Sequence, residues 1–215
     1  MNAPSGEVRF GRRVALGLVA TGGALGAVAL ATRTSPAAVS RAAGETPLPA
    51  LDIADLPVLS SGGAPSVGGG SGWLNSAGFS DADLADKVVL YDFWTFGCIN
   101  CRHTLPHVKA WHERYATDGL VVLSIHTPEF RYEQDPSAVS DFLVEQGVHY
   151  PVVLDPHKVI WRRWENRYWP AFYLYDQNGA LRLRHYGEGS YHEIEDAIRL
   201  LLEVDPEAPR IQLGD

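Results

Sequence analysis

The chain has 215 residues, of which 46% are hydrophobic and 10% aromatic, and its formal net charge is −8. This composition supplies enough apolar surface for a folded domain and is too rich in aromatic side chains for a chain that is disordered throughout. An excess of acidic residues repels nucleic-acid phosphates, so we expect no nucleic-acid partner. The two cysteines of the chain are too few and too close for a framework of structural disulfides.

The N-terminal region has the features of an export signal. Arg9, Arg12 and Arg13 precede a stretch without charged residues from Val14 to Ala31. Basic residues followed by an uncharged stretch are typical of a signal peptide, and a stretch of this length also suffices for an uncleaved membrane anchor. Paired arginines before a mildly apolar stretch suggest the twin-arginine route. We therefore expect an extracytoplasmic protein, exported or tethered to the outer face of the cytoplasmic membrane, with residues 1–31 as its leader.

The segment after the leader differs from the rest of the chain in composition. Residues 32–72 are rich in Ala, Pro, Gly and Ser. Such segments bury too little apolar surface to offset the entropy lost on ordering. They are predicted to form a flexible linker, followed by a folded domain at residues 73–204 and a C-terminal tail at residues 205–215.

The domain alternates segments typical of strands with segments typical of helices. A buried strand is expected at Val88–Trp94, where β-branched and aromatic residues form a continuous apolar run. Further strands are expected at 120–125, 150–154, 171–176 and 181–186, and helices at 98–115, 136–146, 159–164 and 191–204. Strands separated by helices pair in parallel, whereas Asn178-Gly179 predicts a tight antiparallel hairpin. The sequence therefore predicts an α/β fold with a mixed central sheet.

Cys98 and Cys101 lie three positions apart, at the start of the first predicted helix. This spacing suits a redox pair, half of a metal site or a haem attachment site. Haem attachment requires a histidine directly after the second cysteine, where this chain has Arg102. Unpaired N–H groups at a helix N-terminus favour the thiolate, which is the species that attacks disulfides. We therefore expect Cys98 to be the nucleophile and Cys101 to resolve the mixed disulfide.

The sequence also fits three alternatives. His103 and His107 lie at i and i+4 on the helix and could join the two thiols in a metal site. Thr95 precedes Cys98 with the Thr-x-x-Cys spacing of peroxidases of related fold. A third alternative is a non-catalytic binding protein in which the two cysteines form a static disulfide. No organic or metal cofactor is predicted beyond the redox-active cysteine pair.

The segment from Val88 to Pro106, VVLYDFWTFGCINCRHTLP, resembles the active-site region of the thioredoxin superfamily, and in particular its TlpA/DipZ-like extracytoplasmic branch. Similar motifs are WLN at 73–75, HTPEF at 126–130, NRYWPA at 166–171 and GEG at 187–189. The resemblance covers roughly residues 73–203. It implies a thioredoxin-like three-layer sandwich with a helix-strand insertion, and the activity of a thiol:disulfide oxidoreductase.

The resemblance also assigns roles to further residues. Asp92 takes the position of a buried acid that helps to move a proton to or from Cys101. Pro170 takes the position of the cis-proline of the superfamily, and Trp169 before it lines the groove that receives the substrate. Apart from the resemblance, Trp94 is expected to shield the cysteine pair beside the same groove, and the alternative is a plain core residue. Members of this branch usually reduce substrate proteins or small disulfides and receive electrons from a membrane donor of the DsbD/CcdA type.

Overall fold

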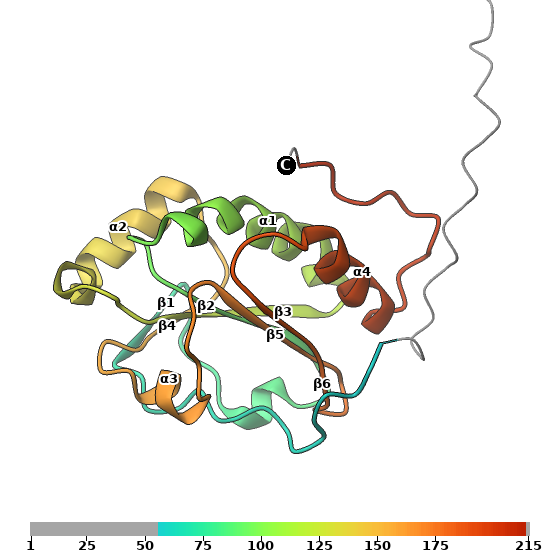
Figure 1. Cartoon of the computed structure of the whole chain (residues 1–215), viewed down its shortest axis with the longest axis horizontal. Coiled ribbons are helices and arrows are strands. Elements are labelled where there is room, and N and C mark those ends of the chain that lie inside the picture. The colour runs from blue at the N-terminus through green and yellow to red at the C-terminus, as the bar shows by residue number, and fades with distance from the viewer. Residues whose placement is uncertain (1–55, 214–215) are drawn as a thin grey trace, which may run out of the picture. The chain divides into compact units, whose positions relative to one another are not determined.

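The computed structural model describes residues 56–213, which contain a mixed sheet of six strands covered on both faces (Figure 1). The strands are β1 (Gly72–Leu74), β2 (Val88–Trp94), β3 (Leu120–His126), β4 (Val152–Leu154), β5 (Ala171–Tyr175) and β6 (Leu181–Tyr186). The helices are α1 (Ile99–Tyr115), α2 (Pro136–Gln146), α3 (Val159–Arg163) and α4 (Tyr191–Leu201). Short 3-10 helices cover Asp81–Leu84, Ala116–Asp118 and Arg131–Gln134.

The sheet has the order β1-β4-β3-β2-β5-β6, so β2 lies inside it. Strands β2, β3 and β4 pair in parallel, whereas β5 pairs antiparallel with both β2 and β6. The predicted mixed sheet and the hairpin between β5 and β6 are therefore confirmed. Helices α1, α2 and α4 cover one face of the sheet, and α3 lies on the other (Figure 1). All seven side chains of β2 are buried because both faces of this strand are covered.

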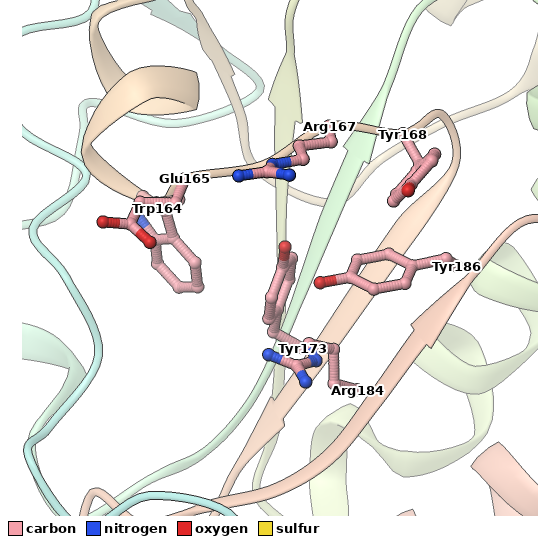
Figure 2. A pocket seen from close by; sticks show the side chains of 7 residues that line it. All are labelled: Trp164, Glu165, Arg167, Tyr168, Tyr173, Arg184 and Tyr186. Atoms are coloured by element: carbon pink, nitrogen blue, oxygen red, sulfur yellow. The ribbon is translucent and has the colours of Figure 1, made fainter.

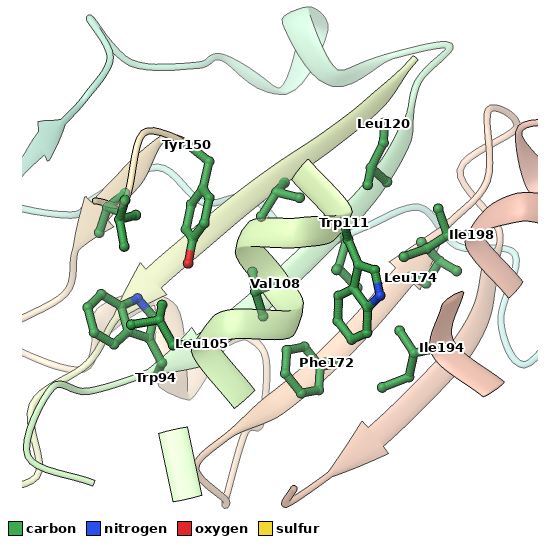
Figure 3. Close-up of a cluster of buried hydrophobic side chains, with 14 of the residues drawn as sticks. Trp94, Leu105, Val108, Trp111, Leu120, Tyr150, Phe172, Leu174, Ile194 and Ile198 are labelled. Carbon is green, nitrogen blue, oxygen red and sulfur yellow. The ribbon is translucent and has the colours of Figure 1, made fainter. Parts of the chain in front are cut away.

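Two clusters of buried side chains hold these layers together. Figure 3 shows the cluster between the sheet and helices α1 and α4. Trp111 of α1 packs against Phe172 of β5, and Ile194 and Ile198 of α4 belong to the same cluster. The second cluster lies on the α3 face and includes Phe93. The two clusters fix the end of β2 from both sides, and the predicted cysteine pair follows directly after that end.

Residues 56–71, here called the N-terminal arm, pack against the domain. The N–H of Leu59 donates to the carbonyl oxygen of Leu181, and the N–H of Leu181 donates to that of Ser60, both at 2.8 Å. Val67 is only 1% exposed. The prediction of a flexible linker up to residue 72 is therefore wrong for the arm. Residues 1–31 of the predicted leader and residues 32–55 of the linker lie outside the described residues.

One of the glycines that suggested flexibility, Gly70, allows a close approach of the backbone to the sheet. A Cβ atom at Gly70 would lie 2.6 Å from Val153 Cγ2 and 2.7 Å from the carbonyl oxygen of Leu154. Only glycine leaves room for the arm at this point. Composition indicated a linker because glycine is common both in flexible segments and at close contacts between backbones.

The predicted C-terminal tail is also packed as far as the structure describes it. Arg199 of α4 is 7% exposed. Its Nη2 atom donates to the carbonyl oxygens of Asp205, Pro206 and Ala208 at 3.0, 3.2 and 2.7 Å. The last helix ends at Leu201 instead of residue 204, because Glu203 adopts the left-handed backbone conformation (φ 55°), which does not continue a helix. Within residues 56–213, no helix is long and apolar enough to cross a membrane.

Candidate active site

Cys98 lies where the central strand passes into the first helix. Strand β2 ends at Trp94, and a short turn follows in which the N–H of Cys98 donates to the carbonyl oxygen of Thr95 at 3.3 Å. Cys98 is the N-cap residue of α1 and has extended backbone dihedral angles. Its side chain is half-buried, whereas Cys101, in the first turn of the helix, is 3% exposed. Both are free thiols, so the structure represents the reduced pair.

The surroundings of Cys98 stabilise its thiolate. The thiol of Cys101 contributes most, and the backbone N–H groups of Cys101 and Asn100 add to it; together they lower the pKa of Cys98 to about 6. Partial burial and the negative charge of Glu129 act in the opposite direction. The helix N-terminus predicted from the sequence is therefore present, but the neighbouring thiol is the stronger contribution.

Cys101 has the opposite character. Burial raises its pKa well above the usual value, and its role as donor to Cys98 raises it further. A thiol with such a pKa keeps its proton at neutral pH. One cysteine of the pair is therefore a half-buried thiolate, and the other is a buried, protonated thiol.

Asp92 lies on β2 and is 2% exposed. Its Oδ2 atom accepts a hydrogen bond from Ser124 Oγ at 2.8 Å, and Oδ1 is buried without a partner among the described residues. Burial raises the pKa of Asp92 to about 7, although the hydrogen bond from Ser124 favours the ionised form. The charge of Asp92 in turn raises the pKa of Cys101. The structure therefore places this acid near the buried cysteine, as the resemblance implied.

A second loop borders the exposed side of the pair. The Sγ atom of Cys98 lies 4.0 Å from the carbonyl oxygen of Trp169. The peptide bond between Trp169 and Pro170 is cis. The carbonyl oxygen of Pro170 accepts a hydrogen bond from the N–H of Gly187 at 2.8 Å, and Trp169 Nε1 donates to the carbonyl oxygen of Thr127 at 2.9 Å. Trp169 and Pro170 thus form one wall beside Cys98.

The indole of Trp169 is held from its faces as well as its edge. The ring of Trp161 lies 4.2 Å from it, measured between ring centroids, and Lys158 Nζ lies 4.6 Å from its centroid. The carboxylate of Asp155 accepts hydrogen bonds from the N–H groups at the start of α3, including that of Trp161 at 2.8 Å. These contacts fix the wall before any substrate arrives.

Trp94 does not belong to this wall. It is 3% exposed, and its ring packs on the α1 and α2 side against His126 and Phe142, at centroid distances of 5.1 and 5.7 Å. The prediction that Trp94 borders the substrate groove is therefore wrong, because a side chain buried this deeply is not accessible to a substrate. Phe96, which is half-buried and stacks on His126 at 5.7 Å, lies closer to the surface.

Glu133 is a functional candidate that the sequence did not indicate. Its side chain is 1% exposed, and its carboxylate accepts hydrogen bonds from the N–H groups of Gly97 (2.8 Å), Glu129 (2.6 Å) and Phe130 (2.7 Å). A Cβ atom at Gly97 would collide with this carboxylate and with the hydroxyl of Tyr132. Glu133 thus ties the turn before Cys98 to the loop after β3. Phe130 has no side-chain acceptor, so the spacing of Glu133 three residues after it is not a complete capping box, and the sequence carried no clear signal for these contacts.

The residues behind the alternative interpretations have other partners. His103 Nδ1 lies 2.7 Å from Glu188 Oε2, and the ring of His107 stacks on Tyr191 at 3.5 Å. Thr95 is fully buried, and its hydroxyl lies 3.3 Å from His126 Nε2. The hydroxyl of the Thr-x-x-Cys spacing is therefore engaged beneath the site.

Comparisons with known proteins identify a family model and similar chains. A family model described as the AhpC/TSA family matches residues 74–184. Protein DipZ of Mycobacterium tuberculosis is 43% identical over 146 residues, which cover 66% of this chain and 21% of DipZ. The thiol-disulfide oxidoreductase YkuV of Bacillus subtilis is 28% identical over 142 residues, which cover 66% of this chain and 95% of YkuV. The chain thus spans about a fifth of the length of DipZ.

Solved structures show the same fold. A thioredoxin-like protein in its oxidized form, solved in solution, superimposes with a TM-score of 0.60 at 27% identity and covers 66% of this chain and 97% of that one. The thioredoxin-like α/β fold implied by the resemblance is therefore confirmed. Because the family model spans more than half of its residues, the chain belongs to the AhpC/TSA family.

Proposed function

We propose that this protein is an extracytoplasmic thiol:disulfide oxidoreductase that acts as a reductase, with Cys98 as the nucleophile and Cys101 as the resolving cysteine. The observation that carries the proposal is the opposite character of the two thiols. Cys98 is half-buried with a pKa of about 6, whereas the pKa of the buried Cys101 is raised. Attack on a disulfide needs one accessible thiolate, and release needs a second thiol that reacts only afterwards.

The reaction begins with the thiolate of Cys98. It attacks one sulfur of a substrate disulfide, so a bond forms between Cys98 and the substrate while the substrate disulfide breaks. The departing sulfur leaves as a thiolate and takes a proton from water. The substrate backbone lies beside Trp169 and Pro170 in this step, because these residues form the wall next to Cys98 Sγ.

The second step returns the pair to a disulfide. Cys101 loses its proton to the carboxylate of Asp92, which has a pKa of about 7 and is therefore partly ionised at neutral pH. The Cys101 thiolate attacks Cys98 Sγ, the mixed disulfide breaks, and the second substrate thiol departs. Two electrons pass from the cysteine pair to the substrate, and the Cys98–Cys101 disulfide remains.

A reductase outside the cytosol must be reduced again after each turnover. Glutathione and thioredoxin systems keep thiols reduced in the cytosol, whereas disulfides persist outside it. The export features of residues 1–31 support the extracytoplasmic location, and the similarity to DipZ and YkuV supports the chemistry. The proposed electron source is a membrane donor of the DsbD/CcdA type, and the proposed substrates are proteins or small disulfides.

The test is a redox titration of the purified protein against glutathione, in which mass spectrometry counts the alkylated thiols. We expect reversible conversion between dithiol and disulfide at a potential near that of thioredoxin, and catalysis of insulin reduction by dithiothreitol. Cys98→Ser should abolish both, and Cys101→Ser should trap a mixed disulfide. A much more oxidising potential would contradict the reductase direction. An unreactive pair, or fast reaction of Cys98 with hydrogen peroxide in place of disulfides, would contradict the function.

A further inference from the structure

A cavity of about 330 Å³ lies beside the wall of the candidate active site, on the α3 face of the sheet. Two arginines and three tyrosines line it together with Trp164 and Glu165 (Figure 2). A volume of this size accommodates one side chain and its backbone, and is at the lower limit of pockets that bind small molecules. No step of the proposed reaction uses this cavity.

Positive charge predominates in the lining of the cavity, where Arg167 and Arg184 outnumber Glu165. Neither Arg167 nor Arg184 forms an ion pair with any residue between 56 and 213, although acidic residues outnumber basic ones in the chain. The guanidinium of Arg184 lies 5.6 Å from the ring centroid of Tyr186. Figure 2 shows the carboxylate of Glu165 on the far side of Trp164, away from the tyrosines. The cavity therefore presents positive charge to a ligand, and guanidinium groups bind carboxylates well.

The tyrosines give the cavity apolar walls with polar edges. The rings of Tyr168 and Tyr186 lie 4.9 Å apart and are 53% and 41% exposed. The ring centroids of Tyr173 and Tyr186 lie 6.2 Å apart. The hydroxyl of Tyr173 donates to Asn166 Oδ1 at 2.9 Å. Aromatic faces suit the methylene groups of a side chain, and the arginines suit a carboxylate at its end. This combination matches glutamate better than a bare inorganic anion.

The cavity and the wall beside Cys98 are built on the same two segments. Tyr168 directly precedes Trp169, whose carbonyl oxygen lies 4.0 Å from Cys98 Sγ. Tyr186 directly precedes Gly187, which donates its N–H to Pro170. A polypeptide that reaches Cys98 along this wall therefore passes the opening of the cavity.

The opposite flank of Cys98 carries the opposite charge. Glu129 follows β3, which pairs with β2 on the side away from β5, and its carboxylate raises the pKa of Cys98. Arg167 precedes β5 and Arg184 lies on β6, on the other side of β2. Glu129 and the two cavity arginines therefore lie on opposite sides of β2, which favours one direction of a bound chain that carries an acidic side chain.

We infer that the cavity binds an acidic side chain of a polypeptide substrate, close in sequence to the cysteine that reacts with Cys98. The inference rests on the proposed function and names its substrate class: polypeptide disulfides with a glutamate or aspartate on the side that runs past Trp169 and Tyr168.

The experiment uses peptides whose single cysteine is blocked as a mixed disulfide with 2-mercaptoethanol. Each peptide carries a single glutamate, placed at one of the three positions before the cysteine or one of the three positions after it. Matched peptides carry glutamine or lysine at the same position. Stopped-flow Trp fluorescence gives the second-order rate constant with the reduced protein. We expect one glutamate peptide to react about 5- to 10-fold faster than its glutamine counterpart, with the advantage much reduced in 0.5 M NaCl, because the contact is a partly exposed charge pair.

Variants connect this preference to the cavity. The double variant Arg167→Ala, Arg184→Ala should lose the preference and react normally with bis(2-hydroxyethyl) disulfide, which has no charge. Arg114→Ala is the control, because Arg114 lies on helix α1, pairs with Asp118 and does not line the cavity. A preference that is absent in the wild type, or that survives in the double variant, would overturn the inference while leaving the oxidoreductase function intact.

A binding measurement keeps the inference independent of redox activity. Peptides with serine in place of cysteine are titrated into the protein and followed by NMR. Tighter binding of the glutamate peptide than of the glutamine peptide, with the difference lost in the double variant, supports the site. Failure of the wild type to react with bis(2-hydroxyethyl) disulfide would overturn only the proposed function. Equal binding of glutamate and glutamine peptides, or shifts caused only by free glutarate or phosphate, would overturn the assignment to a polypeptide.

Discussion

The two thiols of the active site differ because of their positions along one helical turn. Cys98 precedes the first N–H groups of α1 and is half-buried, whereas Cys101 points into the core and is 3% exposed. The thiol of Cys101 is also the main partner that lowers the pKa of Cys98. Each cysteine therefore sets the ionisation of the other, and the order of attack follows from this arrangement.

This arrangement predicts the pH dependence of alkylation. Iodoacetamide should alkylate the Cys98 thiol of the reduced protein at a rate that rises with pH. The midpoint of this rise should lie near pH 6, since only the thiolate reacts. In Cys101→Ala the midpoint should move to higher pH, because the main donor to the thiolate is absent. Peptide mapping by mass spectrometry identifies the alkylated residue. A midpoint near pH 8.5 in the wild type would contradict the assignment of the nucleophile.

Asp92 makes a prediction about stability. Below about pH 4 the carboxyl is protonated in both the folded and the unfolded state. Between about pH 4 and pH 7 the unfolded chain loses this proton while the folded protein keeps it, because burial raises the folded pKa to about 7. The unfolding free energy of reduced wild-type protein should therefore fall by about 1.4 kcal/mol per pH unit from this group, relative to Asp92→Asn. Urea unfolding measures both proteins from pH 4 to pH 8. A constant difference in unfolding free energy between wild type and Asp92→Asn over this range would refute the prediction.

Glu133 is expected to matter for both stability and reactivity. Glu133→Gln keeps the size of the side chain but presents an amide to three backbone N–H groups. An unpaired buried donor costs about 1–3 kcal/mol, and the turn before Cys98 should loosen, which raises the pKa of Cys98. Urea unfolding and the alkylation midpoint measure the two effects. Asp135→Asn, at the exposed N-cap of α2, is the control and should leave the midpoint unchanged.

At the level of elements, the sequence predicted those whose pattern is local. The boundaries of β2, α2 and β6 agree with the prediction to the residue, because apolar runs, Pro136 as the first helical residue and the Asn-Gly turn are local signals. The three residues of β1 carry no such pattern, and their pairing with β4 depends on a strand far along the chain. The cysteine pair was predictable for the same local reason. The contact of Glu133 with Gly97 was not, because it joins residues 36 positions apart.

The attachment of the C-terminal segment to α4 can be tested with one arginine. Arg199→Ala removes donors from three carbonyl oxygens and a buried side chain. We expect the unfolding free energy to fall by about 2–4 kcal/mol. Arg114→Ala, which breaks an exposed i,i+4 ion pair with Asp118, should cost about 0.5 kcal/mol or less. Equal losses in the two variants, measured in urea, would show that the buried contacts do not stabilise the helix.

For the whole molecule, the structured domain begins before the first strand. A chain that starts at Trp73 loses the burial of Val67 and the pairing of Leu59 and Ser60 with Leu181. Its unfolding free energy should be about 3 kcal/mol lower than that of a chain that starts at Leu56. Urea unfolding compares the two, and the alkylation midpoint of Cys98 should be the same in both. Equal stability would restore the boundary expected from composition.

Both margins of the sheet are protected against unwanted pairing. At one margin β1 has only three residues, and the side-chain amide of the next residue, Asn75, donates to the carbonyl oxygens of Val148 and Tyr150. At the other margin the N-terminal arm occupies the start of β6. Exposed strand edges are the templates from which soluble proteins begin to aggregate. A protein whose arm stays in place should therefore remain dispersed at high concentration, and detachment of the arm would open the edge from which assembly starts.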